Sequence, residues 1–222
     1  YEMVMGKINN DSVADGYGIA LRNGKTLWVQ DDRMFEPIIS YNLKEALEYG
    51  GWTNEPTNPV QSPTGWEGTT IAEQSDFNVN GTYRRWYRGD YPDCKIGYAT
   101  STDGITWTPD AGNPISFAPT IADGSTQFPY VVQYGDNFYM FVLNTANMKY
   151  YLFNVTTPTN PIVMNDGNPV LEVSQGWEAN NLYNVGVCID GDGVWHMLYE
   201  AGAGNQDFNL GYTHSTLAAM NW

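Results

Sequence analysis

Positive charge is scarce in this sequence of 222 residues. It has 10 Lys and Arg against 25 Asp and Glu, a formal net charge of −15, and only 16% of its residues are charged, where about 25% is usual. Binding to nucleic acid needs clustered Lys and Arg that release counterions from phosphates. We therefore expect no nucleic-acid partner.

Long apolar runs are also missing. The apolar runs are all short, as near Val-Cys-Ile at 187–189 and Met-Phe-Val at 140–142. A membrane helix needs about 18 consecutive apolar residues, so we expect no membrane span. Aromatic residues are plentiful instead, with 16 Tyr and 8 Trp, enough for a large core. The 23 Gly and 12 Pro indicate many turns between short elements. An all-β chain is predicted.

An Asn-Pro motif recurs along the chain at equal steps. Asn58-Pro59-Val60, Asn113-Pro114-Ile115 and Asn168-Pro169-Val170 are each 55 residues apart. Gly65-Trp66-Glu67 and Gly176-Trp177-Glu178 each precede two further apolar segments in the same order, which end at Trp107 and Trp222. Such periods are typical of repeat architectures.

Each unit is predicted to be a four-stranded antiparallel sheet. In one unit, residues 130–134 and 138–142 form a hairpin, residues 150–153 a third strand and residues 161–164 an outer strand. Such sheets protect their faces by stacking around an axis. We predict a single β-propeller domain over residues 1–222, with an Asn-Pro near each passage between blades. The blades are approximately 9–60, 61–115, 116–170 and 171–222.

The number of blades has a second interpretation. Residues 18–28 resemble residues 97–107, with the same span from Gly to Trp. Residues 1–7 would then be the second strand of a blade in an incomplete five-bladed ring. Such a ring would be open, or it would be closed by pairing of residues 1–8 with the last blade. The chain begins at Tyr1 without a charged-then-apolar leader, which indicates a removed signal or a piece of a longer protein. Residues 42–49 are the one helix candidate.

The two cysteines, Cys94 and Cys188, form neither a disulfide framework nor a metal-ligand spacing. Cys94 falls in a loop between a second and a third strand, and Cys188 falls on an inner strand two blades later. Their α-carbons should then lie beyond the limit of about 7 Å for a disulfide. Both are predicted to be free thiols.

The segments 80–89 and 96–107, followed by Asn113-Pro114-Ile115, resemble a blade of the five-bladed glycosidase propellers. This superfamily includes the arabinanases and β-xylosidases of glycoside hydrolase family 43, the fructosidases and the mannoside phosphorylases, and the resemblance covers about residues 60–222. It implies cleavage of a glycosidic bond by carboxylates that project from innermost strands into an axial funnel. One carboxyl group must be protonated and one ionised.

The family 43 pattern fits this chain only in part. It implies an Asp-Pro on the first blade, which this sequence lacks, and a Glu acid on the third, where Gln127 stands; an amide cannot serve as the acid. By position, the ionised carboxylate is predicted to be Asp15 or Asp76 and the proton donor Glu178 or Glu73. Burial against Trp or Tyr should raise the pKa of the donor.

Each of these residues also has a structural interpretation. Asp15 and Asp76 lie beside turns, where Asp commonly forms hydrogen bonds with its own backbone. Glu178 recurs as Glu67 after the same Gly-Trp pair, and a residue repeated in two blades is typically a structural bracket, one that holds two segments together. No cofactor is expected, although Asp190 and Asp192 would suit calcium if their hairpin needed a cation. The histidines, His196 and His214, interpreted as lying on separate blades, make a weak case for a metal.

Carbohydrate is the expected partner. Trp86, Tyr91, Gln127 and Tyr183 are predicted to line the funnel, where aromatic rings stack on sugar faces. Two functions stay open, because fold does not decide between them: a glycoside-processing enzyme, and a non-catalytic glycan-binding or structural module of a secreted protein or virion. Either function suggests an extracellular or virion-surface location. The oligomeric state is not indicated by the sequence.

Overall fold

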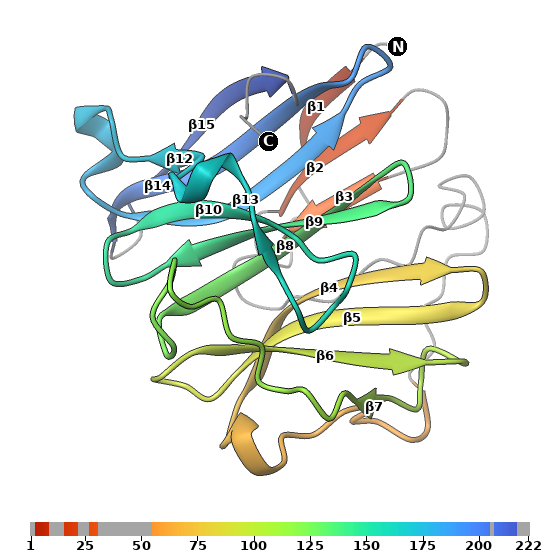
Figure 1. Ribbon diagram of the computed structural model, residues 1–222. Helices are drawn as coiled ribbons and strands as arrows, with labels where there is room; N and C mark the ends of the chain where they lie inside the picture. Colours follow the sequence, from red (N-terminus) through yellow and green to blue (C-terminus); the bar gives the residue numbers. More distant parts are fainter. Residues whose placement is uncertain (1–2, 9–15, 22–26, 31–54, 205–206, 217–222) are drawn as a thin grey trace. The chain divides into compact units, whose positions relative to one another are not determined.

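The computed structural model describes residues 3–8, 16–21, 27–30, 55–204 and 207–216 (Figure 1). The chain forms two compact units, Tyr1–Val60 and Gln61–Trp222. The described residues are all-β apart from three short 3₁₀ helices, and none of their helices is long and apolar enough to cross a membrane. Asp15 and the helix candidate at 42–49 lie outside the described residues.

The first unit contains a three-stranded antiparallel sheet in the order β1-β2-β3. Its strands are β1 (Met3–Ile8), β2 (Gly16–Leu21) and β3 (Leu27–Gln30). Residues 18–28 resemble residues 97–107, which begin in the third strand of a predicted blade. The middle position of β2 agrees with that assignment, because a third strand lies between the second and the fourth.

The second unit begins with η1 (Gly65–Glu67) and a four-stranded antiparallel sheet in the order β4-β5-β6-β7. These strands are β4 (Ile71–Val79), β5 (Thr82–Gly89), β6 (Lys95–Ser101) and β7 (Thr108–Pro109). The tight turn at Asn80-Gly81 joins β4 to β5, and both of its residues have positive φ, a conformation that Asn and Gly tolerate best.

A second sheet has the order β11-β10-β9-β8, with β12 also paired to β10. Its strands confirm the predicted hairpin, third strand and outer strand. They are β8 (Thr126–Tyr134), β9 (Asn137–Asn144), β10 (Lys149–Asn154), β11 (Ile162–Val163) and β12 (Leu171–Glu172), with η2 (Asn165–Gly167) between the last two.

A third sheet follows η3 (Gly176–Glu178) and has the order β13-β14-β15. It contains β13 (Leu182–Ile189), β14 (Val194–Gly204) and β15 (Asp207–Thr216). Only three strands, rather than the four predicted, belong to this sheet among the described residues.

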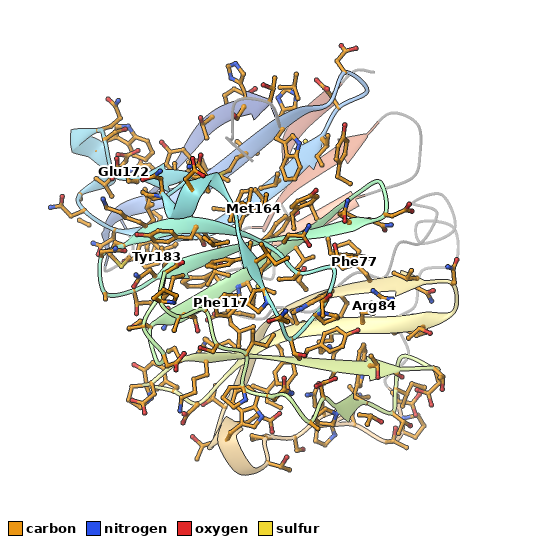
Figure 2. All side chains as sticks on the ribbon, in the orientation of Figure 1. Phe77, Arg84, Phe117, Met164, Glu172 and Tyr183 are labelled. Carbon is orange, nitrogen blue, oxygen red and sulfur yellow. The ribbon has the colours of Figure 1, made fainter. Side chains whose placement is uncertain are left out.

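The middle sheet, β8–β12, has a core on each of its faces. One core contains Phe141 and Leu152 of this sheet with Trp195 of β14; the other contains Met140 and Phe153 with Trp86 of β5. Alternate residues of β9 and β10 thus point to opposite faces, and Figure 2 shows Phe77 and Phe117 among the side chains between the sheets. Antiparallel sheets stacked face to face are the propeller blades that the sequence predicts.

Two of the Asn-Pro segments occupy equivalent places. The N–H of Ile115 donates to the Ile96 carbonyl at 2.8 Å, and the N–H of Val170 donates to the Tyr150 carbonyl at 2.8 Å. Each segment therefore lies along the third strand of its sheet, before the chain passes to the next sheet. Asn58 belongs to the first unit and is exposed.

Candidate functional site

Each inner strand of the second unit carries one β-bulge near its start. The register shifts between Ala72 and Ser75 in β4, between Gln127 and Tyr130 in β8, and between Leu182 and Val185 in β13. Successive bulges are 55 residues apart. The extra residues form what we call the bulge edge: Glu73, Gln74, Phe128, Pro129, Tyr183 and Asn184. Bulges re-aim side chains and are frequent beside active sites.

Glu73 links two neighbouring bulges. It has a φ of +52°, and its carboxylate pairs with Nε of Arg88 at 2.8 Å and accepts the N–H of Phe128 at 2.9 Å. Only 10% of its side chain is exposed. Burial raises the pKa of Glu73, and Arg88 and the Phe128 N–H offset this in part. The pKa of Glu73 is therefore shifted in the direction expected of a proton donor.

Polar side chains surround this ion pair. Nη1 of Arg88 lies 3.7 Å from Sγ of Cys94, and Nε2 of Gln127 donates to the same sulfur at 2.8 Å. The ring of Tyr91 lies 5.9 Å from the Arg88 guanidinium and is 64% exposed. A buried Glu–Arg pair therefore lies beside an exposed aromatic ring, which could stack on a sugar.

A second carboxylate at the bulge edge was missed from the sequence. Glu200 of β14 lies opposite the bulge of β13, and its Oε2 accepts Nδ2 of Asn184 at 3.1 Å. Buried Tyr150 donates its hydroxyl to the Tyr183 carbonyl. Burial, then Glu73, then Glu200 raise the pKa of Tyr150 well above its ordinary value. Both carboxylates therefore lie within electrostatic reach of one phenol.

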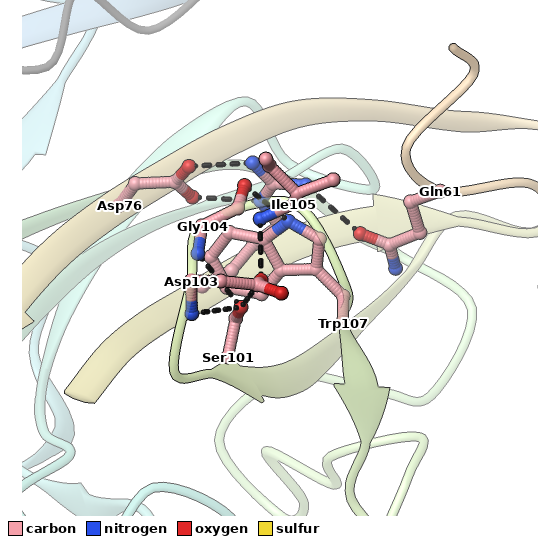
Figure 3. A network of polar contacts seen from close by, with 8 residues as sticks. Gln61, Asp76, Ser101, Asp103, Gly104, Ile105 and Trp107 are labelled. Atoms are coloured by element: carbon pink, nitrogen blue, oxygen red, sulfur yellow. Dashed lines mark hydrogen bonds and ion pairs between the residues drawn. The ribbon is translucent and has the colours of Figure 1, made fainter. Parts of the chain in front are cut away.

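Asp76 is engaged by an arginine. Its two oxygens accept Nε and Nη2 of Arg85 at 2.8 and 2.6 Å, and Arg85 also donates to Gln61 and lies 3.8 Å from the Trp107 ring (Figure 3). Such a bidentate pair is geometrically fixed. Asp76 therefore helps to position Arg85 over Trp107.

Asp103 anchors the turn that presents Trp107. Its Oδ1 accepts the N–H of Ile105 and the Ser101 hydroxyl, both at 2.8 Å (Figure 3). The same oxygen accepts the N–H of Thr106 at 2.7 Å. These hydrogen bonds hold the pKa of Asp103 well below its usual range. The segment from Ser101 to Trp107 thus has a structural role, as an anchored turn that leads into β7.

Glu178 lies in a bracket that Glu67 repeats. The Tyr199 hydroxyl donates to Oε1 of Glu178 at 2.7 Å, and the N–H of Gln175 donates to Oε2 at 2.5 Å; Glu67 accepts Tyr87 and the N–H of Thr64 in the same way. Both carboxylates are buried.

The pKa of Glu178 moves against the expectation for a proton donor. Burial raises it, but the hydrogen bonds from Tyr199, Gln175 and Ser174 together lower the pKa below its ordinary value. The expected rise is therefore wrong for this residue, because the donors favour the ionised form more than burial opposes it.

The predicted sugar-binding residues lie in different surroundings. Trp86 has no exposed surface and packs in the core, so it offers no face to a ligand. Tyr91 and Gln127 lie beside the Glu73–Arg88 pair, as described above. Tyr183 is on the bulge edge, where its ring contacts the partly exposed Phe208 edge-on at 4.9 Å.

The Asp190–Asp192 turn is satisfied by the protein itself. Asp190 accepts the N–H groups of Asp192 and Val194, both at 2.9 Å, and contacts Nε2 of His196 at 2.9 Å. His196 and His214 are direct partners on adjacent strands, so the interpretation that they lie on separate blades is wrong. No group of three or more His, Cys, Asp or Glu among the described residues is placed to hold a metal ion.

The two cysteines are free thiols, as predicted. Cys94 is buried in the loop between β5 and β6, and Cys188 lies on β13.

No protein-family model and no curated protein matches this sequence. Several solved structures do. BT0996, in an RGII complex, shares 17% identity with a TM-score of 0.57, covering 91% of this chain and 57% of that protein. A glycosyl hydrolase from Bacteroides ovatus shares 14% identity with a TM-score of 0.52, covering 75% and 58%. The Bombyx mori GH32 β-fructofuranosidase BmSUC1 shares 16% identity with a TM-score of 0.54, covering 68% and 35%.

This chain has the blade fold of the five-bladed glycosidase propellers. At these identities the likeness establishes the fold, which confirms the predicted fold class. The chain spans between 35% and 58% of the length of these three proteins.

Proposed function

We propose that this chain belongs to a carbohydrate-active propeller that acts on a poly- or oligosaccharide at the bulge edge, by glycoside hydrolysis. The observation that carries the proposal is a pair of carboxylates from different sheets that reach neighbouring bulges: Glu73 accepts the N–H of Phe128 in the bulge of β8, and Glu200 accepts Nδ2 of Asn184 in the bulge of β13. Two carboxyl groups at one site are the minimum for cleaving a glycosidic bond. The fold of the glycosidase propellers supports the same reaction class.

In this proposal Glu73 is the proton donor. Its raised pKa keeps more of the carboxyl group protonated near the working pH. When Glu73 gives its proton to the leaving oxygen, Arg88 and the Phe128 N–H are in place to stabilise the carboxylate that remains. Glu200 is the second carboxylate, which activates water or attacks the sugar, and Asp15 stays an alternative for that role.

The deciding experiment measures hydrolysis of oligosaccharides and of aryl glycosides, using arabinosides, xylosides, fructosides and mannosides. Glu73→Gln should lower the rate on oligosaccharides by a factor of about 10² to 10⁴. It should lower the rate much less on nitrophenyl glycosides, whose leaving group needs no proton. Glu200→Gln should impair both substrates. Glu172→Gln is the control, because Glu172 is exposed and its carboxylate pairs with Lys149 and not with a residue of the bulge edge.

A non-catalytic glycan-binding module is the second candidate. Gln127, at the position expected for the acid, donates to Cys94, and Asp76 is held by Arg85. In that case no substrate is cleaved, and glycan binding survives in Glu73→Gln.

Polymeric glycans do not cross membranes unaided, so either function also suggests a location outside the cell or on a virion surface.

A further inference from the structure

A hydrogen-bonded chain of three side chains lies on the third sheet, apart from the bulge edge. His196 of β14 contacts Oδ2 of Asp190 through Nε2 at 2.9 Å and the hydroxyl of Tyr212 through Nδ1 at 2.8 Å. Tyr212 is 54% exposed. Along β14, His196 is four residues from Glu200, a separation of about 13 Å. These three residues therefore form a separate place on the molecule, independent of the proposed function.

The strand register gathers these groups on one face of the sheet. His196 is the direct partner of Cys188 on β13 and of His214 on β15. Tyr212 lies two residues before His214, and side chains two residues apart on a strand share a face. The Tyr212 ring stacks on both imidazoles, with centroids 6.1 Å from His196 and 5.9 Å from His214. Stacking and a hydrogen bond thus hold the phenol beside His196 together.

The protons of this chain have a defined order when the imidazole is neutral. Asp190 accepts hydrogen bonds from His196 and from the N–H of Val194, and these lower the pKa of its carboxyl. An ionised carboxylate can only accept, so Nε2 of His196 carries the ring proton. Nδ1 is then the bare nitrogen, and it accepts the hydroxyl of Tyr212. The imidazole is therefore placed to take the proton of an exposed phenol.

A nucleophile within hydrogen-bond reach of a base, which a third group orients, is the arrangement of activated nucleophiles, and tyrosine is one of the residues that serve in this role. Leu198 is the cross-strand partner of Tyr212, and exposed Leu210 lies two residues before it, so the phenol has apolar surroundings for an acyl group. We propose that Tyr212 is the nucleophile of a second site, which hydrolyses small uncharged carboxylic esters. His196 is its base, and Asp190 is a positioning residue.

The proposed reaction needs only water as a co-reactant. The Tyr212 oxygen attacks the ester carbonyl, and its proton passes to Nδ1 of His196. The ester C–O bond breaks as this proton is given to the leaving oxygen, and the acyl group remains on the phenol oxygen. Water then attacks the acyl carbonyl and gives a proton to His196, which returns it to the departing phenol oxygen. The products are a carboxylic acid and an alcohol.

The test treats the full chain with 4-nitrophenyl acetate, follows the release of nitrophenolate, and maps acetyl groups by mass spectrometry after an acid quench. Tyr91 and Tyr134 are also exposed, and the two histidines of the chain, 196 and 214, both lie beside Tyr212. Acetylation of Tyr212 should therefore be faster by a factor of about ten or more than that of either. The rate should rise between about pH 5 and 8, where histidine loses its proton, whereas a phenol without a base gains reactivity only toward about pH 10.

Variants separate the base from its surroundings. His196→Gln keeps a polar side chain but no base, and it should slow the acetylation of Tyr212 by a factor of about 10² or more and abolish the rise between pH 5 and 8. Asp190→Asn should also slow it, because an amide that donates to Nε2 leaves the ring proton on Nδ1. His214→Gln is the matched control, since it removes a stacked imidazole but neither hydrogen bond, and should leave the rate nearly unchanged.

Each contrary result has a definite meaning. Equal acetylation of Tyr91 and Tyr212, a label on Cys188 in place of Tyr212, or an equal loss in His196→Gln and His214→Gln would overturn the role of Tyr212. Release of nitrophenolate that stops at one equivalent would overturn hydrolysis. Glu73→Gln should leave the ester reaction unchanged, so failure of this site and failure of the proposed function are distinguishable. Thermal unfolding of each variant confirms that it is folded when it is assayed.

Discussion

Glu73 and Glu178 are both shielded from solvent, yet their pKa values move in opposite directions. Glu73 accepts one backbone N–H and pairs with one arginine, and burial outweighs these contacts. Glu178 accepts two backbone N–H groups and a phenol, which outweigh burial. The donors that reach a carboxylate therefore decide whether it is suited to giving a proton or to holding a turn.

Replacement of Glu178 by Gln should destabilise the protein. An amide keeps the shape but turns an NH₂ group toward donors that need an acceptor, and hydrogen bonds to a charged group contribute about 1.5–3 kcal/mol each. We expect Glu178→Gln to lower the free energy of unfolding by about 2–4 kcal/mol, as measured by urea denaturation. Glu67→Gln should behave alike, and Glu172→Gln should stay within about 0.5 kcal/mol of the parent. If Glu178→Gln leaves the free energy of unfolding unchanged, Glu178 does not stabilise the contact between η3 and Tyr199.

Glu73 should make stability depend on pH. Because its pKa in the folded state is raised above that of the unfolded chain, about 4.3, the folded state binds more protons, and stability falls as pH rises above this value. Glu73→Gln removes that loss. The Tm of the parent minus that of the variant should therefore decrease as pH rises from about 4 to 7. A difference that grows with pH would contradict the raised pKa.

The brackets act between elements as well as within them. Glu67 of η1 and Glu178 of η3 hold Tyr87 of β5 and Tyr199 of β14. Each tyrosine then lies over a glycine of the neighbouring strand. A Cβ on Gly97 would lie 3.1 Å from the Tyr87 ring and 2.4 Å from the Trp66 ring, and one on Gly211 would lie 2.1 Å from the Tyr199 ring. The ring fills the space that a side chain would need.

These glycines give a prediction with a control in the same fold. Gly97→Ala and Gly211→Ala should each lower the free energy of unfolding by about 1–3 kcal/mol, because the added methyl group forces the aromatic ring to move. Gly186 of β13 has no atom within 4 Å of a Cβ built on it, so Gly186→Ala should cost much less. Equal costs at the three positions, in denaturant titrations, would show that the close contacts are not limiting.

Much of this element structure is readable from local sequence. The hairpin from residue 130 to 142 follows from β-forming residues on either side of a turn. The equal steps of Asn113 and Asn168 predict equivalent places near the passages between sheets. The bulges are not readable in this way, because a bulge is a property of the pairing between two strands. Glu200 escaped notice for the same reason, since only the register places it opposite Asn184.

The candidate site was predictable to a similar degree. Glu73 and Gln127 were found by their position near the starts of inner strands. The engagement of Asp76 was not, because Arg85 is its direct partner across the strand pair, and that partner depends on the register. Trp86 was misplaced because an aromatic residue of a strand faces either a ligand or a neighbouring sheet, and sequence alone does not distinguish these faces.

At the scale of the second unit, the middle sheet couples the two cores. Leu152 and Phe153 are neighbours on β10, yet Leu152 lies in the core shared with β13–β15 and Phe153 in the core shared with β4–β7. Both side chains are 1% exposed or less. Because one strand contributes to both cores, loss of either core removes support from the other.

We therefore expect residues 61–222 to unfold in one cooperative step. Leu152→Ala should lower the free energy of unfolding by about 2–5 kcal/mol and Phe153→Ala by about 3–5 kcal/mol, from lost burial and the cavity left behind. In hydrogen–deuterium exchange, either variant should reduce the protection of both β5 and β14, although each substitution touches one core. Reduced protection confined to β14 in Leu152→Ala and to β5 in Phe153→Ala would instead show that the cores unfold independently, so that the middle sheet separates the two cores and does not couple them.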